Sequence, residues 1–121
     1  MPERTADSIT RQILDFRDAR DWAQFHSPKD MAMAISIEAA ELCEHFLWKS
    51  PAECEQRLAE RREEVEEEVA DIGIYLFELA HNLGIDLLAA MERKIARNGE
   101  KYPVEMAKGS NRKYSEFGAP R

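Results

Sequence analysis

Two pairs of carboxylates, each three residues apart, are the side chains of this sequence best suited to chemistry. Glu38 and Glu41 form the first pair, and Glu68 and Asp71 form the second. On an α-helix, residues at this spacing lie on neighbouring turns of one face. Carboxylates from two facing helices could bind a hard divalent cation such as Mg²⁺, which prefers oxygen ligands.

The apolar pattern indicates which acids could reach such a site. At 100° per residue, Glu38 lies in the middle of an apolar stripe that includes Ile35 and Leu42. A bare carboxylate there would be costly unless it were paired or metal-bound. Glu41 lies at the edge of the stripe, whereas Glu44 falls towards solvent.

The second pair also lies beside an apolar stripe. Glu68 and Asp71 line one flank of it, and Tyr75 stands one turn beyond Asp71. This pattern is compatible with a metal site and equally with a set of buried salt bridges. No cysteines and histidines have the spacing of a zinc site.

Aromatic and basic residues near these acids could bind a flat ring and its phosphates. The aromatic candidates are Trp22, Phe25, His26, Trp48 and Tyr75. They could stack a ring, with His26 hydrogen-bonding its edge, or they could pack in the core. Lys94 and Asn98 share a helix face, where Lys94 could extend to the surface or contact a phosphate.

Helices must position these side chains, because no stretch alternates apolar and polar residues like a half-buried strand. The pattern predicts an all-α fold, a bundle of four to five helices. Ser27 and Ser50 each precede a proline, a helix-start signal. We expect helices at about 8–22, 28–49, 51–82 with a bend or break near Arg61 and Arg62, and from a cap at Asp86 to about 98–99.

Composition narrows the class of protein. The 121 residues fit a single domain spanning 1–121, with a core at about 8–104 and a polar tail at 105–121. A net charge of −7 argues against binding a nucleic-acid polymer. We expect a cytoplasmic protein without membrane association, because no apolar run reaches ~18 residues and the first residues are too polar for a signal peptide. Cys43 and Cys54 are expected to be reduced.

The sequence resembles a known family at these same acids. IEAAEL at 37–42 and EEVADI at 67–72 resemble the ExxE…ExxD signature of the all-α, MazG-like nucleoside triphosphate pyrophosphohydrolases. The resemblance is closest to the dCTP pyrophosphatase branch, and it covers roughly residues 8 to 117. It also includes DWAQFH at 21–26, WK at 48–49, IYL at 74–76, Lys94, Asn98, YP at 102–103 and RKY at 112–114.

This resemblance implies Mg²⁺-dependent hydrolysis of a nucleoside triphosphate, dCTP or a 5-modified dCTP, to the monophosphate and pyrophosphate. It implies that Mg²⁺ is held by Glu38, Glu41, Glu68 and Asp71, with Glu41 and Glu38 also assisting the attacking water. The base and sugar would be bound by Trp22, Gln24, Phe25, His26, Trp48 and Tyr75, and the phosphates by Lys94 and Asn98. Enzymes of this branch are typically tetramers with sites between subunits, so we expect a homo-oligomer, a dimer of dimers.

Two positions depart from the family pattern. Ile37 occupies the place of a further glutamate in many relatives, so neither a second metal ion nor a broad house-cleaning substrate range is implied. Ile13 stands where this branch carries a substrate-contacting histidine, so the reaction is better supported than the preference for dCTP. The alternatives are hydrolysis of dUTP or of phosphoribosyl-ATP on a related bundle, and a non-enzymatic helical oligomerisation module.

Overall fold

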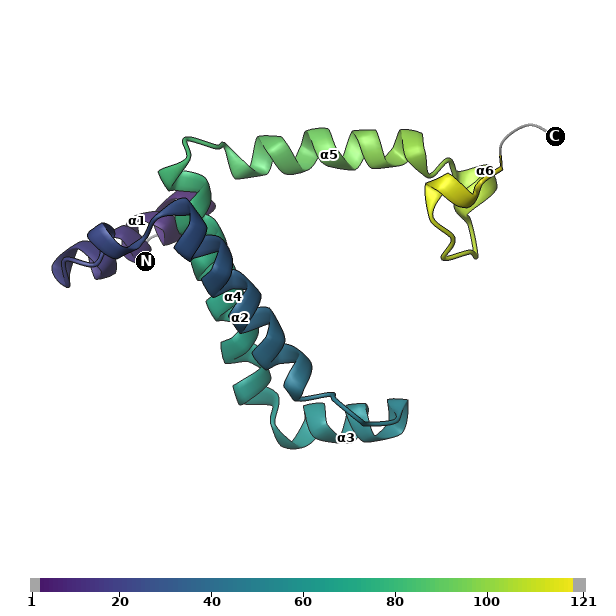
Figure 1. Cartoon of the computed structure of the whole chain (residues 1–121), viewed down its shortest axis with the longest axis horizontal. Coiled ribbons are helices and arrows are strands. Elements are labelled where there is room, and N and C mark those ends of the chain that lie inside the picture. Colours follow the sequence, from purple (N-terminus) through teal and green to yellow (C-terminus); the bar gives the residue numbers. More distant parts are fainter. Residues whose placement is uncertain (1–2, 119–121) are drawn as a thin grey trace. The chain divides into compact units, whose positions relative to one another are not determined.

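Helices joined by short turns make up residues 3–118, the part of the chain described by this computed structural model. The chain divides into two compact units, one ending at Ile85 and one beginning at Asp86. The first unit contains α1 (Ala6–Ala19), the 3₁₀ helix η1 (Ala23–Phe25), α2 (Pro28–Glu44), α3 (Pro51–Glu60) and α4 (Arg62–Asn82) (Figure 1). The second unit contains α5 (Leu87–Lys101), α6 (Val104–Ala107) and a second 3₁₀ helix, η2 (Tyr114–Glu116). The predicted all-α fold is confirmed over the described residues.

Side-chain caps set the starts of the helices. The Ser27 and Ser50 hydroxyls each accept a hydrogen bond of 3.2 Å from the backbone N–H three residues on. Asp86 caps α5 in the same way, with a bond of 3.0 Å from a backbone N–H. Thr5 caps α1, so this helix begins two residues earlier than expected. These starts are largely readable from the sequence because a cap is a local interaction.

The helix ends are less regular than expected. The helix α1 ends at Ala19 and α2 ends at Glu44, whereas the sequence analysis placed these ends at about 22 and 49. Turns occupy residues 45–48, and Trp48 has a left-handed backbone with φ of 61°. The helical segment at 51–82 is broken at Arg61, where a bend or break was expected, and forms two helices. Trp48 therefore lies outside α2, and helical spacing cannot place its side chain beside Glu41.

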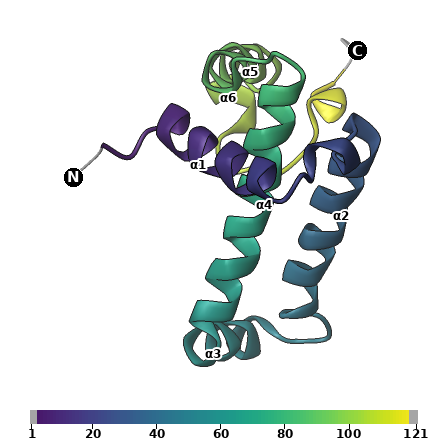
Figure 2. The ribbon, with the colours of Figure 1, turned by 90° about the vertical axis from the view of Figure 1, so that its left-hand side faces the viewer.

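In the first unit, α1, α2 and α3 all pack against α4. Figures 1 and 2 show that α2 runs antiparallel alongside α4. Among the described residues, the buried apolar side chains are Met31 of α2 and Val65 and Ala80 of α4. The antiparallel pair brings the two acid-bearing helices face to face.

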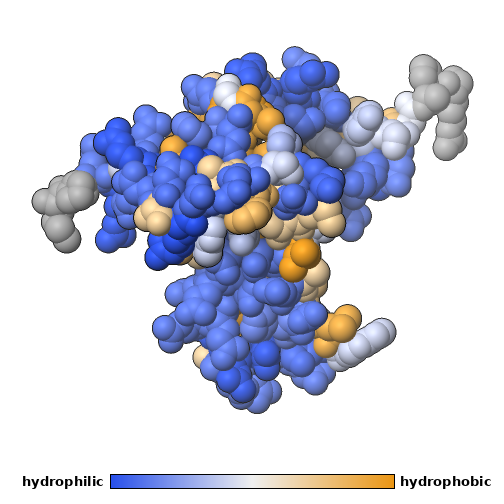
Figure 3. Space-filling view, turned by 60° about the vertical axis from the view of Figure 1, so that its left-hand side comes forward, coloured by the Kyte–Doolittle hydropathy of each residue, from blue (hydrophilic) through white to orange (hydrophobic). Residues whose placement is uncertain are grey.

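Large apolar side chains also remain at the surface of these helices. On α2 and α4 they include Met33, Ile37, Val69, Ile74 and Leu76. Figure 3 shows apolar side chains open to solvent within a mostly hydrophilic surface. These residues follow the helical pattern of the sequence, but the helices of the first unit leave them exposed.

The second unit consists of α5 and the segment that follows it. The helix α5 continues through Gly99 to Lys101, and Pro103 accounts for its end because a proline disfavours helical backbone in the preceding residue. The tail was expected to be irregular, but it contains α6 and η2. The ring of Tyr102 packs edge-on against the rings of Tyr114 and Phe117, at centroid distances of 6.0 and 5.6 Å. Within the described residues no one helix has the length and apolarity needed to cross a membrane, although α4 and α5 taken together pass that test by length and composition alone.

Candidate metal and nucleotide site

Three of the four predicted metal-binding carboxylates come together between α2 and α4. Glu38, Glu41 and Glu68 each offer an oxygen, and these oxygens all lie within 4.8 Å of one another. Asp71 is exposed and falls outside this group of three, one turn further along α4 than Glu68. Its charge nevertheless acts on Glu38. We call Glu38, Glu41 and Glu68 the acidic cluster.

Burial and mutual repulsion make the acidic cluster unfavourable as three bare carboxylates. Burial raises the pKa of Glu38 to about 7, and the neighbouring Glu41, Asp71 and Glu68 add to the shift. Burial and Glu41 likewise raise the pKa of Glu68, an effect opposed by His45. The Oε2 atoms of Glu38 and Glu68 are both buried without a hydrogen-bond partner. Buried polar atoms are normally paired, so these two require a ligand or a proton.

The acidic cluster has the chemistry of a hard divalent-cation site. Its donors are all carboxylate oxygens, the type that Mg²⁺ prefers. Oxygens bound to one Mg²⁺ lie ~3–4 Å apart, so small side-chain movements would let the three residues share an ion. A cation would provide the missing partner for both buried oxygens and would offset the repulsion that raises the two pKa values.

A buried histidine connects α3 to the acidic cluster. The Arg57 Nε donates to His45 Nδ1 at 3.3 Å, and His45 Nε2 lies 3.9 Å from a Glu68 oxygen. Because Nδ1 accepts this hydrogen bond, the ring proton is on Nε2, the nitrogen facing Glu68. His45 was assigned no role from the sequence, although it lies seven residues after Glu38 and so on the same helical face.

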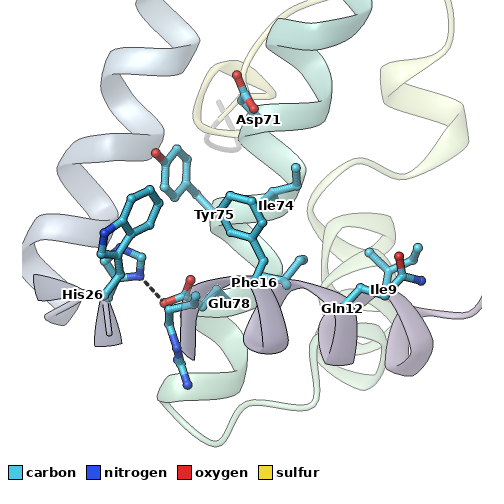
Figure 4. Close-up of a pocket in the computed structure, with 11 residues that line it drawn as sticks. Ile9, Gln12, Phe16, His26, Asp71, Ile74, Tyr75 and Glu78 are labelled. Atoms are coloured by element: carbon cyan, nitrogen blue, oxygen red, sulfur yellow. Dashed lines mark hydrogen bonds and ion pairs between the residues drawn. The ribbon is translucent and has the colours of Figure 1, made fainter. Parts of the chain in front are cut away.

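A pocket of about 480 Å³ lies between α1, α4 and the turn that precedes α2 (Figure 4). Its volume is within the range of small-molecule sites. It is lined by Ile9, Gln12, Ile13, Phe16, Arg17, Trp22, His26, Asp71, Ile74, Tyr75 and Glu78. Asp71 links this pocket to the acidic cluster, because it lines the pocket and also raises the pKa of Glu38.

The pocket includes several of the predicted base-binding residues. Trp22, His26 and Tyr75 all line it. Burial, followed by the charges of Glu38 and Asp71, raises the pKa of Tyr75, so its phenol stays protonated at neutral pH and can donate a hydrogen bond. Ile13 also lines this pocket.

Three other predicted binding residues of the first unit, Gln24, Phe25 and Trp48, do not line the pocket. Gln24 is engaged with Asp21, and the side chains of Phe25 and Trp48 are 62% and 92% exposed. Lys94 and Asn98 belong to α5 in the second unit. The Lys101 charge, with some burial and Arg97, lowers the pKa of Lys94, as expected where basic side chains gather.

Sequence reasoning missed the most buried charged residue of the pocket, Glu78, whose side chain is 3% exposed. Its Oε2 accepts a hydrogen bond from Asn82 Nδ2 at 3.2 Å, and His26 Nδ1 lies 2.7 Å from it. An Arg17 nitrogen lies 3.6 Å away. The signal was available, since Glu78 follows Asp71 by seven residues and Tyr75 by three, on the same face of α4.

Comparisons with known proteins assign the family. The model of the MazG-like family matches residues 33–117, and the chain belongs to this family. It is 38% identical over 118 residues to dCTP pyrophosphatase 1 of Rattus norvegicus and to that of Homo sapiens. Each alignment covers 96% of this chain and 69% of the relative.

A solved structure agrees with the fold. The crystal structure of a pyrophosphatase from Archaeoglobus fulgidus has a TM-score of 0.79 and 40% sequence identity with this chain. The match covers 85% of this chain and 96% of the other. The family suggested by the ExxE…ExxD pattern is therefore confirmed.

Proposed function

We propose that this chain is a Mg²⁺-dependent nucleoside triphosphate pyrophosphohydrolase that converts dCTP, or a 5-modified dCTP, to the monophosphate and pyrophosphate in the cytoplasm. The observation that carries the proposal is the pair of buried, partnerless oxygens of Glu38 and Glu68 beside an aromatic pocket. The names of the relatives, dCTP pyrophosphatase 1, support the same reaction and the same base.

In this proposal Glu38, Glu41 and Glu68 bind the ion, and Asp71 completes the ligand set from the pocket side. The bound ion would offset the charge of the triphosphate and polarise its phosphoryl oxygens. Glu41 is the exposed member of the cluster, so one of its oxygens would bind the ion and the other could orient or deprotonate the attacking water. The water oxygen bonds to the α-phosphorus, the bond from that phosphorus to the bridging oxygen breaks, and pyrophosphate leaves.

The pocket residues would bind the nucleoside. Trp22 and Tyr75 offer aromatic surfaces for a base and sugar, and His26 offers a ring nitrogen for hydrogen bonding. Lys94 and Asn98 would contact the phosphates.

A second copy of the chain would complete the site. The large apolar residues left exposed on α5 include Leu88, Met91 and Ile95, in addition to those on α2 and α4. Trp48 is 92% exposed on a left-handed backbone, a conformation that needs support and often marks a functional position. We infer that these surfaces form the interfaces of a homotetramer and that Trp48 reaches a partner's pocket. The family match runs through both units, which supports treating residues 1–121 as one domain.

The test is pyrophosphate release from a panel of nucleotides in the presence of Mg²⁺. The panel contains the four common dNTPs, 5-methyl-dCTP, dUTP and phosphoribosyl-ATP. We expect dCTP or its 5-methyl form to have the highest kcat/KM, and loss of activity on addition of EDTA. Highest activity on dUTP or phosphoribosyl-ATP would assign the chain to a related enzyme. If no compound releases pyrophosphate, the proposed enzymatic activity is refuted, and the alternative of a non-enzymatic oligomerisation module is favoured.

A further inference from the structure

Glu78 is a buried carboxylate to which the proposed reaction gives no task. Its Oε2 lies within 2.7 Å of His26 Nδ1 and accepts a hydrogen bond from Asn82. An Arg17 nitrogen 3.6 Å away adds a positive charge. All of these groups belong to the wall of the pocket or lie next to it, as Figure 4 shows for His26 and Glu78.

The contact with Glu78 determines which nitrogen of His26 carries the proton. A carboxylate can only accept, so Nδ1 must donate its proton to Glu78. In the neutral ring the other nitrogen, Nε2, then presents a lone pair. None of the hydrogen bonds formed by the described residues uses Nε2 of His26, and this nitrogen is not among the buried atoms without a partner. The His26 ring therefore offers an accessible acceptor at the pocket wall.

The position along α4 at which His26 contacts Glu78 suggests which part of a nucleotide His26 would meet. Glu78 follows Glu68 by ten residues and Asp71 by seven, so it lies ~15 Å and ~10 Å further along the helix axis. A nucleotide whose phosphates lie at the acidic cluster would extend past Tyr75 and bring its base to this end of the pocket.

We propose that Glu78 positions His26 so that Nε2 accepts a hydrogen bond from the exocyclic amino group of the base, and that this contact selects cytosine over uracil. The inference rests on the proposed function. Uracil has a carbonyl oxygen in place of that amino group, and two acceptors cannot form a hydrogen bond. Glu78 is thus a positioning residue, and His26 is the residue that reads the base.

Two substitutions, alone and combined, test the roles of His26 and Glu78. His26→Phe keeps a flat ring and removes both nitrogens, whereas Glu78→Met removes the acceptor that holds Nδ1. We expect each to lower the ratio of kcat/KM for dCTP over dUTP about tenfold or more. The double variant should show no further loss, since Glu78 acts only through His26. His81→Phe makes the same change at an exposed histidine and should leave the ratio unchanged.

A third variant addresses the risk that a buried Glu78→Met chain unfolds. Glu78→Gln keeps an amide oxygen that can accept the Nδ1 proton, and it should retain most of the dCTP preference. Dideoxy-CTP, which lacks the sugar 3′-hydroxyl, tests the competing partner for Nε2. The preference for dCTP over dideoxy-CTP should not change in His26→Phe.

An NMR measurement tests the positioning step without substrate. In a long-range ¹H–¹⁵N spectrum, His26 of the wild type should show a protonated Nδ1 and an unprotonated Nε2. Glu78→Met should remove that preference, and Glu78→Gln should preserve it. A wild type in which Nε2 carries the proton would overturn the inference.

The kinetic outcomes are equally decisive. The inference is wrong if the wild type does not prefer dCTP to dUTP, or if His26→Phe leaves the preference intact. It is also wrong if only the comparison with dideoxy-CTP changes, because His26 would then bind the sugar. Failure of the proposed function is a different result, in which the wild type releases no pyrophosphate from any nucleotide. The NMR measurement would still test the contact between Glu78 and His26.

Discussion

The raised pKa of Glu38 makes the stability of the metal-free protein depend on pH in a defined direction. Its ordinary pKa is 4.5, and in the folded protein the pKa is about 7. Between these values the folded protein keeps a proton that the unfolded chain has released, so the free energy of unfolding falls as pH rises. Below pH 4.5 the group imposes no penalty, and above about pH 7 the penalty is complete.

The magnitude follows from the size of the shift. One pKa unit corresponds to about 1.36 kcal/mol. The rise in the pKa of Glu38 from 4.5 to about 7 can therefore lower the free energy of unfolding by at most about 3 kcal/mol. Because solvent reaches the adjacent Glu41, we reduce the expected penalty to about 1–2 kcal/mol. Glu38→Gln removes the charge with little change in shape. In EDTA at pH 8 it should raise the melting temperature by roughly 3–8 °C, and at pH 4.5 it should have little effect.

Binding of a divalent cation should make the wild type more stable than Glu38→Gln. The assay is thermal unfolding at pH 8 in EDTA and then in Mg²⁺. At hundredfold excess over its Kd, a bound ion stabilises the wild type by about 2.7 kcal/mol, which exceeds the penalty of about 1–2 kcal/mol, whereas Glu38→Gln has lost a ligand and should gain much less. Glu44→Gln, an exposed change on the same helix, is the control and should behave like the wild type. The reasoning is refuted if Glu38→Gln is no more stable than the wild type in EDTA at pH 8.

Three further predictions concern activity. Glu68→Gln should lower kcat/KM at least about 100-fold in pyrophosphate-release assays because it removes a proposed ligand, whereas Glu44→Gln should retain wild-type values. Trp22→Ala should raise KM for dCTP about tenfold with a smaller change in kcat, since stacking contributes to binding; an unchanged KM would remove Trp22 from the base site. If Trp48 serves a partner's pocket, an unfolded and refolded equal mixture of the Trp48→Ala and Glu38→Gln chains should recover up to about one quarter of wild-type activity. Recovery no greater than the sum of the separate variants would place Trp48 in its own chain's site or in none.

The sequence predicts the parts of the fold that depend on local interactions. The caps at Ser27, Ser50 and Asp86 are formed by side chains and backbone three residues apart, and all three were predicted. The end of α2 depends instead on the turn at 45–48, where Trp48 adopts an unusual backbone. No local pattern at this non-glycine residue signals a positive φ.

The same distinction holds at the candidate site. Helical spacing was sufficient to single out Glu38, Glu41 and Glu68. Glu38 and Glu41 lie on one helix, and Glu68 lies on the helix packed against it, so each residue can be placed from the apolar face of its own helix. It overlooked Glu78, although this residue shares the helical face of Asp71 and Tyr75, because spacing along one helix does not identify the partners that stabilise a buried charge. Those partners, Arg17 and His26, are 61 and 52 residues away in the sequence. Arg17 reaches Glu78 through the packing of α1 on α4, and His26 reaches it from the turn that precedes α2.

The acidic cluster and the small core have a common physical consequence. The helices α2 and α4 use the centre of their shared face to hold three carboxylates, so fewer apolar side chains can be buried there, and Met31, Val65 and Ala80 are the buried apolar residues of the described chain. In the proposed function, each of these features would have a complementary binding partner: a cation for the carboxylates, and a second copy for the exposed apolar residues. Binding either partner would relieve a cost already present in the single chain. Stability and function are therefore expected to depend on the same two associations, and loss of either should weaken both.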